Sequence, residues 1–295
     1  MFHKIILGSD GSEGARNAAL LASEFAKRFE SQVVVVNAFD ISFAAAGDIG
    51  PWSLSVTPQI MQECMEGERA AAENAVKPLL ETLQPSYQML QELGHPVDAI
   101  LSVAQREQAD LIVVGSRGLS GLKEIFLGSV SHGILHHAHC PVLVERGEPR
   151  PIRRILLASD SSASAWKAAE AACELGTGFN ACLTVLMVHE PVGRARKSAG
   201  EPHPVRTPEE LQEYERRRPS LEAGMEESAK ETGATFQICQ EEGHPGETIV
   251  RFAAEKEYDL IVMGSRGLGK FERLLLGSVS NYVAHHASCP VLIVR

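Results

Sequence analysis

Apolar and polar residues alternate along the chain in blocks that predict strands and helices in turn. Aliphatic runs such as VVVV (33–36) and LIVV (111–114) are typical of parallel strands buried on both faces. Between them, residues 13–29 carry alanine and phenylalanine at helical spacing. In the first half we expect strands near 3–8, 32–38, 86–91, 110–115 and 141–145, and helices near 13–29, 58–83, 97–108 and 129–138. In the second half we expect strands near 154–158, 182–188, 235–239, 259–263 and 290–294.

The chain repeats itself with a period of about 149 residues. Residues 110–146 and 259–295 align without a gap, and 22 of 37 positions are identical. The starts of the halves match as well, KIILGSDGS against RILLASDSS. We therefore expect two domains, 1–147 and 151–295, each an α/β unit with a doubly wound, five-stranded parallel sheet flanked by helices.

Composition and charge narrow the classes of protein that fit. Aromatic residues make up only 5% of the 295 residues, so the core must be largely aliphatic. The net charge of -10 argues against nucleic acid as the main partner. The chain shows no secretory signal, no C-x-x-C pair and no apolar stretch of the ~18 residues that could span a bilayer. These features predict a cytoplasmic protein with no membrane partner and with reduced cysteines, of which Cys140 and Cys289 precede a buried strand and are expected in the core.

Two loops in each half are candidates for ligand binding. In open α/β sheets, ligands bind at the carboxyl ends of the strands, where the strand order reverses. One loop follows the first strand and carries Asp10, or Asp160 in the repeat. The other loop follows the fourth strand and is rich in glycine. It reads Gly115-Ser116-Arg117-Gly118, nine residues, then Gly128-Ser129-Val130-Ser131, and in the repeat Gly264-Ser265-Arg266-Gly267, nine residues, then Gly277-Ser278-Val279-Ser280.

The second part of each glycine motif precedes the last helix of its half. The N–H groups at the start of a helix lack partners within the helix, and together with serine hydroxyls they make a site for an anion. Arg117 or Arg266 could add positive charge beside it. The sequence therefore predicts phosphate binding.

These motifs resemble the universal stress protein family in its ATP-binding branch. The pattern of that family is G-x-x-G, nine residues, G-[S/T], after a strand of the D-L-I-V-[V/M]-G type and before S-V-S and C-P-V-L-[V/I]. Both halves match throughout, and the resemblance covers almost the whole chain. It implies the strand order 3-2-1-4-5 of adenine nucleotide alpha hydrolase-like domains, and two sites for ATP, ADP or AMP.

The resemblance also implies the roles of residues in each site. Asp10 and Asp160 would contact the adenine, with the backbone of Ala38 and of His189 beside the base. The glycine motifs would hold ribose and phosphates, and Mg²⁺ would bridge the phosphates without side-chain ligands. The second half departs from the first where Ala158 replaces Gly8 and Ser161 replaces Gly11. The residues assigned to the two sites are Gly8, Ser9, Asp10, Ala38, Val114, Gly115, Ser116, Arg117, Gly118, Gly128, Ser129, Val130, Ser131, Ala158, Ser159, Asp160, His189, Met263, Gly264, Ser265, Arg266, Gly267, Gly277, Ser278, Val279 and Ser280.

Other interpretations of the same residues stay open. The glycine loops could be tight turns without a ligand, and Asp10 and Asp160 could be helix N-caps. The window from Gly264 to Lys270 fails as a Walker loop because Phe271 stands where Ser or Thr must ligate Mg²⁺. The histidines of the last helix of the first half, His132 and His136 among them, lack a carboxylate or cysteine to complete a metal site.

The sequence favours a nucleotide-binding stress-response protein that senses or stores ATP, with slow hydrolysis at most. It shows no base or charge clamp of the kind that a fast hydrolase needs. A true ATPase or phosphotransferase and a nucleotide-free interaction scaffold are the alternatives.

Two further expectations concern assembly and long loops. By the family resemblance, the final strands 142–146 and 291–295 should pair, so that one chain forms a pseudo-dimer, and two chains could form a homodimer. The long connections 39–57 and 189–206 are candidates for lids or partner-contact segments.

Overall fold

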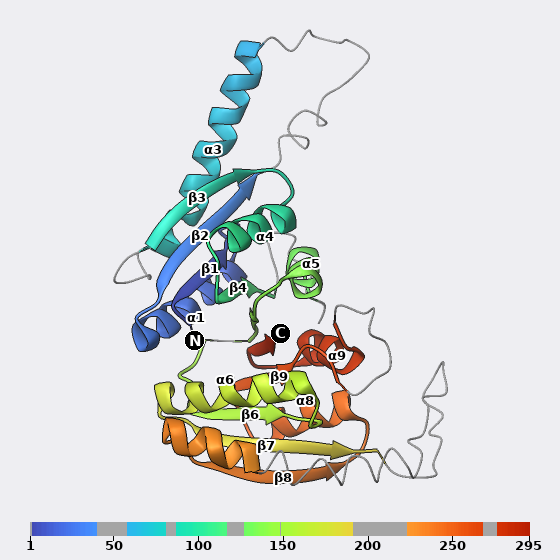
Figure 1. Cartoon of the computed structure of the whole chain (residues 1–295). Helices are drawn as coiled ribbons and strands as arrows, with labels where there is room; N and C mark the ends of the chain where they lie inside the picture. Colours follow the sequence, from blue (N-terminus) through green and yellow to red (C-terminus); the bar gives the residue numbers. More distant parts are fainter. Residues whose placement is uncertain are drawn as a thin grey trace, which may run out of the picture. The chain divides into compact units, whose positions relative to one another are not determined.

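The structure is a computed structural model, and it describes residues 2–39, 58–80, 87–116, 127–147, 149–190, 223–267 and 276–295. It divides into two compact units, Phe2–Glu145 and Arg146–Arg295 (Figure 1). The predicted long connections fall almost wholly outside the described residues, as do Arg117 and Gly118.

The first unit is a five-stranded parallel sheet in the order β3-β2-β1-β4-β5, the order that the family resemblance implies. Each strand and helix lies within a few residues of its expected place. The elements are β1 (Lys4–Gly8), α1 (Glu13–Phe29), β2 (Gln32–Phe39), α3 (Pro58–Leu80), β3 (Tyr87–Leu93), α4 (Pro96–Arg106), β4 (Leu111–Gly115), α5 (Ser129–His137) and β5 (Val142–Glu145).

The second unit repeats this architecture. Its sheet has the order β8-β7-β6-β9-β10, again with parallel neighbours. The elements are β6 (Arg154–Ala158), α6 (Ala163–Phe179), β7 (Cys182–His189), β8 (Phe236–Glu242), α8 (Pro245–Glu255), β9 (Leu260–Gly264), α9 (Ser278–His286) and β10 (Val291–Val294), with a further helix at 223–232.

Helices cover both faces of each sheet because the chain winds in two directions. From β1 it moves to β2 and β3, and then it returns past β1 to β4 and β5. With right-handed crossovers, α1 and α3 fall on one face and α4 and α5 on the other. In agreement, α1 contacts α3, and α4 contacts α5. The direction reverses between β1 and β4, so the loops that follow these two strands flank the crevice where such sheets bind ligands.

An aspartate before the fourth strand fastens it to the first strand in both units. The carboxylate of Asp110 accepts hydrogen bonds from the backbone N–H groups of His3 and Lys4, each at 2.9 Å. Asp259 accepts the equivalent bonds from Arg153 and Arg154, also at 2.9 Å. The aspartate of the D-L-I-V pattern therefore has a structural role, because it joins the first and fourth strands of each sheet.

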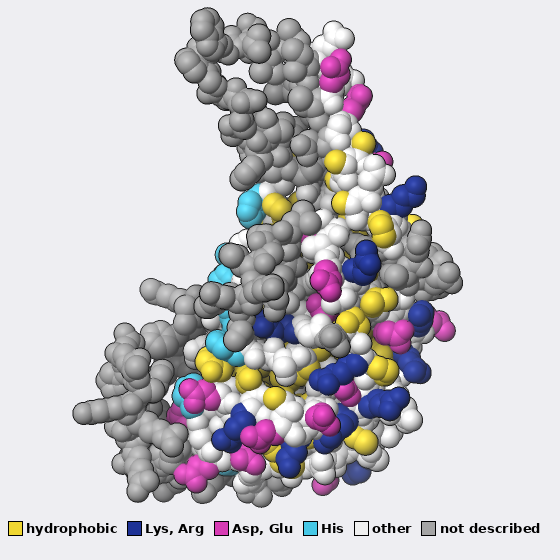
Figure 2. All heavy atoms as spheres, turned by 180° about the vertical axis from the view of Figure 1, so that it is seen from behind, with side chains coloured by type: hydrophobic (Ala, Val, Ile, Leu, Met, Phe, Trp, Pro, Cys, Tyr) yellow, Lys and Arg dark blue, Asp and Glu magenta, His cyan; other side chains and the backbone are white. Residues whose placement is uncertain are grey.

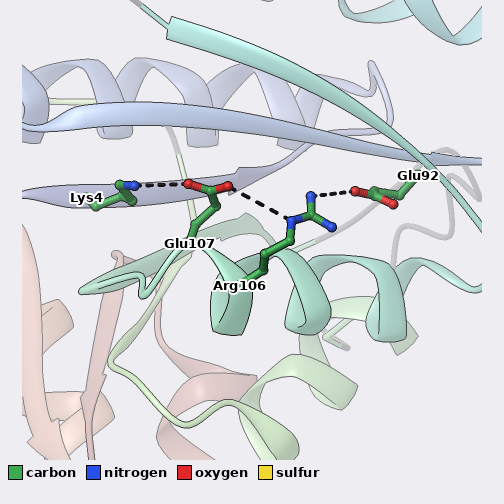
Figure 3. Close-up of polar contacts among 4 residues, drawn as sticks. All are labelled: Lys4, Glu92, Arg106 and Glu107. Carbon is green, nitrogen blue, oxygen red and sulfur yellow. Dashed lines mark hydrogen bonds and ion pairs between the residues drawn. The ribbon is translucent and has the colours of Figure 1, made fainter.

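The surface contacts around the first strand differ between the two units. In the first unit, Lys4 bonds Glu107 at 3.0 Å and Arg106 bonds Glu92 at 2.8 Å, which ties the end of α4 to β1 and β3 (Figure 3). In the second unit the residue equivalent to Lys4 is Arg154, which lies over the ring of Tyr258 at 4.9 Å from its centroid. On the face drawn in Figure 2, basic and acidic side chains of the described residues are intermixed.

Candidate functional site

The turn from the first strand into the first helix is built around an aspartate and a serine. The Oδ1 atom of Asp10 accepts a hydrogen bond from the N–H of Ser12 at 3.0 Å, and the hydroxyl of Ser12 accepts one from Ala15 N–H at 3.2 Å. In the second unit, Asp160 and Ser162 make the same two bonds. The helix N-caps are therefore Ser12 and Ser162, and the interpretation of the two aspartates as N-caps is wrong.

The residue after each aspartate adopts a left-handed backbone conformation. Gly11 has φ +77°, and Ser161 has φ +62°. A Cβ on Gly11 would lie 2.6 Å from the carbonyl oxygen of Ala75 in α3. The first unit therefore requires glycine at this turn, whereas the second unit holds a serine there under strain.

The end of the fourth strand lies directly on the first helix of its unit. A Cβ on Gly115 would be 2.6 Å from the carbonyl oxygen of Gly14 at the start of α1. In the second unit, a Cβ on Gly264 would be 2.7 Å from the carbonyl carbon of Ser164. The two candidate loops thus approach backbone to backbone, which only glycine permits.

Hydrogen bonds join the two parts of each glycine motif, although the residues between them lie outside the described ranges. The N–H of Gly128 donates to Ser116 O at 2.8 Å, and the hydroxyl of Ser131 donates to Gly115 O at 2.5 Å. In the second unit the corresponding bonds, at 2.7 Å and 2.8 Å, run from Gly277 and Ser280 to Ser265 and Gly264. Because Ser131 and Ser280 are buried and donate to carbonyls, the exposed hydroxyls at these helix starts are those of Ser129 and Ser278.

The starts of α5 and α9 differ from those of α1 and α6 in their caps. Gly128 and Gly277 are the N-caps, both extended, and no side-chain hydrogen bond caps either helix within the described part of the chain. The N–H groups of the first turn therefore lack the serine cap that α1 and α6 have. Together with the positive end of the helix dipole, they favour negative charge beside the first and fourth strands.

In the second unit the two candidate loops touch. A Cβ on Gly267 would meet the Oδ2 atom of Asp160, so the predicted phosphate loop lies against the predicted base-binding residue. Arg266 and Gly267 are exposed. In the first unit the corresponding Arg117 and Gly118 lie outside the described residues.

The other predicted residues divide by place. Val130 and Val279 are half-buried in the first turns of α5 and α9. Those at the ends of the first and fourth strands are buried and form the floor of the candidate site: Gly8, Ser9, Val114, Ser116, Ala158, Ser159, Met263 and Ser265.

The second strands correct one expectation. Gly8 pairs with Val36 and Ala158 with Leu186, so Ala38 is equivalent to Val188, and His189 is equivalent to Phe39. The prediction that Ala38 and His189 occupy equivalent places beside the base is therefore wrong by one position. His189 does end β7 at the carboxyl edge of the sheet.

Two polar residues near these loops are absent from the sequence-based prediction. Asn37 is 4% exposed, and its Nδ2 donates to the carbonyl of Ser9 at 2.9 Å. Its equivalent in the second unit is Met187. Ser164 contacts the glycine-rich loop of the second unit. A lone polar residue in the apolar run VVVVNAF was the available signal for Asn37, whereas nothing local marks Ser164.

The histidine pair of α5 and the cysteines before the last strands are not among the loop residues described above. The rings of His132 and His136 are 4.4 Å apart, but no group of three metal-ligating side chains occurs among the described residues. Cys140 and Cys289 are buried, as expected, and burial raises the pKa of Cys289 to about 12.

Together these features define a tandem pair of doubly wound α/β units, each with a Gly-Ser helix start that has no side-chain cap among the described residues. The model of the universal stress protein family matches residues 1–146 and again residues 151–295. The chain belongs to this family.

Known relatives agree in sequence and in fold. A universal stress protein of Methanocaldococcus jannaschii is 35% identical over 147 residues, which is 49% of this chain and 82% of that protein. A universal stress protein of Mycolicibacterium smegmatis is 28% identical over 300 residues, 99% of this chain and 96% of that one. The crystal structure of a universal stress protein from Archaeoglobus fulgidus has a TM-score of 0.70 at 23% identity, covering 99% and 98% of the two chains, and shares the fold. None of the described helices is long and apolar enough to cross a membrane.

Proposed function

We propose that each half of this protein binds one adenine nucleotide, and that the protein acts in the stress response as a sensor or store of ATP. The observation that carries the proposal is the start of α5 and α9, where a Gly-Ser pair opens the helix without a side-chain cap among the described residues. The proposal is supported by the reversal of strand order beside these helix starts, and in the second unit by the contact between Gly267 and Asp160.

The chemistry of the site favours binding over catalysis. Backbone N–H groups, serine hydroxyls and Arg266 would hold the phosphates, while Asp10 and Asp160 would face the base. Mg²⁺ would bind through the phosphates, in keeping with a site that offers backbone donors instead of a set of carboxylates. Hydrolysis would be slow, and a single-turnover rate of about 1 s⁻¹ or faster would instead favour an ATPase or phosphotransferase.

Calorimetric titration tests this function. ATP, ADP and AMP are titrated into the full chain with and without Mg²⁺, and then into Gly118→Val and Gly267→Val. A branched side chain at either glycine should remove binding in its own half and leave the other half intact. If wild type binds no adenine nucleotide, the scaffold alternative replaces this proposal.

The proposal extends to assembly. We infer from the family resemblance that the two halves form an intramolecular pseudo-dimer through their final strands, and that the full chain can form a homodimer. The reason for the pairing is that exposed apolar strand edges are otherwise prone to aggregation.

A further inference from the structure

Two serines at the start of α6, the N-cap Ser162 and Ser164, hold the glycine-rich loop of the second unit. The hydroxyls of Ser162 and Ser164 lie 3.2 Å apart, and both donate to the carbonyl oxygen of Arg266, Ser162 at 3.3 Å and Ser164 more closely. The first unit retains the first of these serines as Ser12, but glycine, Gly14, occupies the place of Ser164. The serine closest to the loop of the second unit therefore has no counterpart in the first unit.

The position of the Arg266 carbonyl determines the direction of the next N–H group. In a trans peptide the C=O and the N–H point in opposite directions. Because the carbonyl of Arg266 points at α6, the N–H of Gly267 points away from α6. The nitrogen of Gly267 lies beside the start of α9, since a Cβ on Gly277 would be 3.8 Å from it.

We propose that Ser164 is a positioning residue of the second nucleotide site, which orients the Gly267 N–H toward a bound phosphate. This inference rests on the proposed function. The oriented N–H adds a donor to those of the first turn of α9, so that one phosphate receives hydrogen bonds from both parts of the glycine motif. Ser164 itself does not touch the nucleotide.

The consequence is an asymmetry between the two halves. The loop of the second unit is pre-organised by a side-chain hydrogen bond, and binding loses less entropy when a loop is already ordered. In the first unit, no side-chain hydroxyl is available at Gly14 to play this part. The second site therefore binds phosphates more tightly than the first, although its turn at Ser161 is the more strained.

The test uses the full chain with the first site blocked by Gly128→Val, and compares ATP with adenosine. In this background, Ser164→Ala should lower the affinity for ATP about fivefold, the effect of one hydrogen bond, and leave the affinity for adenosine unchanged. Ser164→Thr, which keeps the hydroxyl, should restore ATP binding. A purely structural role for Ser164 would lower both affinities together.

The outcomes separate this inference from the proposed function. If the Gly128→Val protein binds ATP, and adding Ser164→Ala leaves that affinity unchanged, the proposed role of Ser164 is wrong while the proposed function stands. An equal loss of ATP and adenosine binding also overturns it. If neither the wild-type protein nor the Gly128→Val protein binds ATP, both the proposed function and the proposed role of Ser164 are wrong.

The equivalent position of the first unit allows a matched experiment in which a serine is added and nucleotide affinity should increase. With the second site blocked by Gly277→Val, Gly14→Ser places a hydroxyl where the second unit has one. The affinity of the first site for ATP should rise about fivefold, again without a change for adenosine. An unchanged or reduced affinity would contradict the positioning role.

Discussion

Ser161 occupies a turn whose backbone conformation is unfavourable for a residue with a side chain. Its backbone lies in the left-handed region at φ +62°, and its buried hydroxyl has no hydrogen-bond partner in the described structure. That conformation costs a non-glycine residue roughly 1–2 kcal/mol. After allowing for the flexibility of glycine in the unfolded chain, Ser161→Gly should stabilise the second unit by about 1 kcal/mol in urea unfolding.

The equivalent turn of the first unit provides the control. Gly11→Ser imposes the same strain and also places a Cβ 2.6 Å from Ala75 O, so it should destabilise the first unit by about 2 kcal/mol. Both changes are measured in the full chain. A loss of stability in Ser161→Gly would show that the serine hydroxyl has a partner or a role that this account lacks.

The cysteines should differ sharply in reactivity. Burial raises the pKa of Cys173 from 9.0 to about 11 and that of Cys289 from 9.0 to about 12, whereas Cys182 is exposed. The thiolate is the reactive form, so a thiol reagent at about pH 8 should modify Cys182 and leave Cys173 and Cys289 unmodified until the protein unfolds. Peptide mapping by mass spectrometry reads this out. Rapid labelling of Cys289 in the folded protein would contradict its placement.

At the scale of elements, the last two helices of each unit pack through a glycine on one helix and a larger side chain on the other, and the two units place the glycine on opposite helices. In the first unit, a Cβ on Gly133 of α5 would lie 2.7 Å from Val97 of α4. In the second unit, a Cβ on Gly246 of α8 would lie 2.8 Å from Tyr282 of α9. Each helix pair thus combines one glycine with one large residue, in reversed order.

This exchange predicts coupling between the two positions. Gly246→Val should cost the second unit about 2 kcal/mol through overpacking against Tyr282. Adding Tyr282→Gly recreates the arrangement of the first unit, so the double variant should be more stable than the sum of the single changes implies. Urea unfolding of all four proteins gives the coupling energy. Strict additivity would mean that the two residues do not compete for the same space.

The strands and helices were predictable from the sequence, whereas the N-caps, the register of the second strands and the long-range contacts were not. Aliphatic runs and helical stripes located the strands and helices, because burial on both faces leaves a continuous apolar pattern. The N-caps were not predictable, since Asp10 and Ser12 are equally good capping residues by type. The sequence alignment paired Ala38 with His189, one position off, because β2 and β7 share few residues. A run of apolar residues does not show which position in one strand is equivalent to which in the other. The bond from Ser164 to Arg266 spans 102 positions and could be found only in the structure.

At the scale of the whole molecule, the proposed pairing of the final strands has a direct test. A fragment of residues 1–147 would expose the edge of β5, and we expect it to dimerise or aggregate in analytical ultracentrifugation. A wild-type fragment that stays a stable monomer would contradict the pairing.

The most direct test of the central claim is the number of ATP molecules that one full-length chain binds, measured by equilibrium dialysis with Mg²⁺. Two glycine-rich helix starts, one in each unit, predict saturation at two nucleotides per chain. Saturation at one would show that only one half binds a nucleotide, and no saturable binding would contradict the claim for both halves.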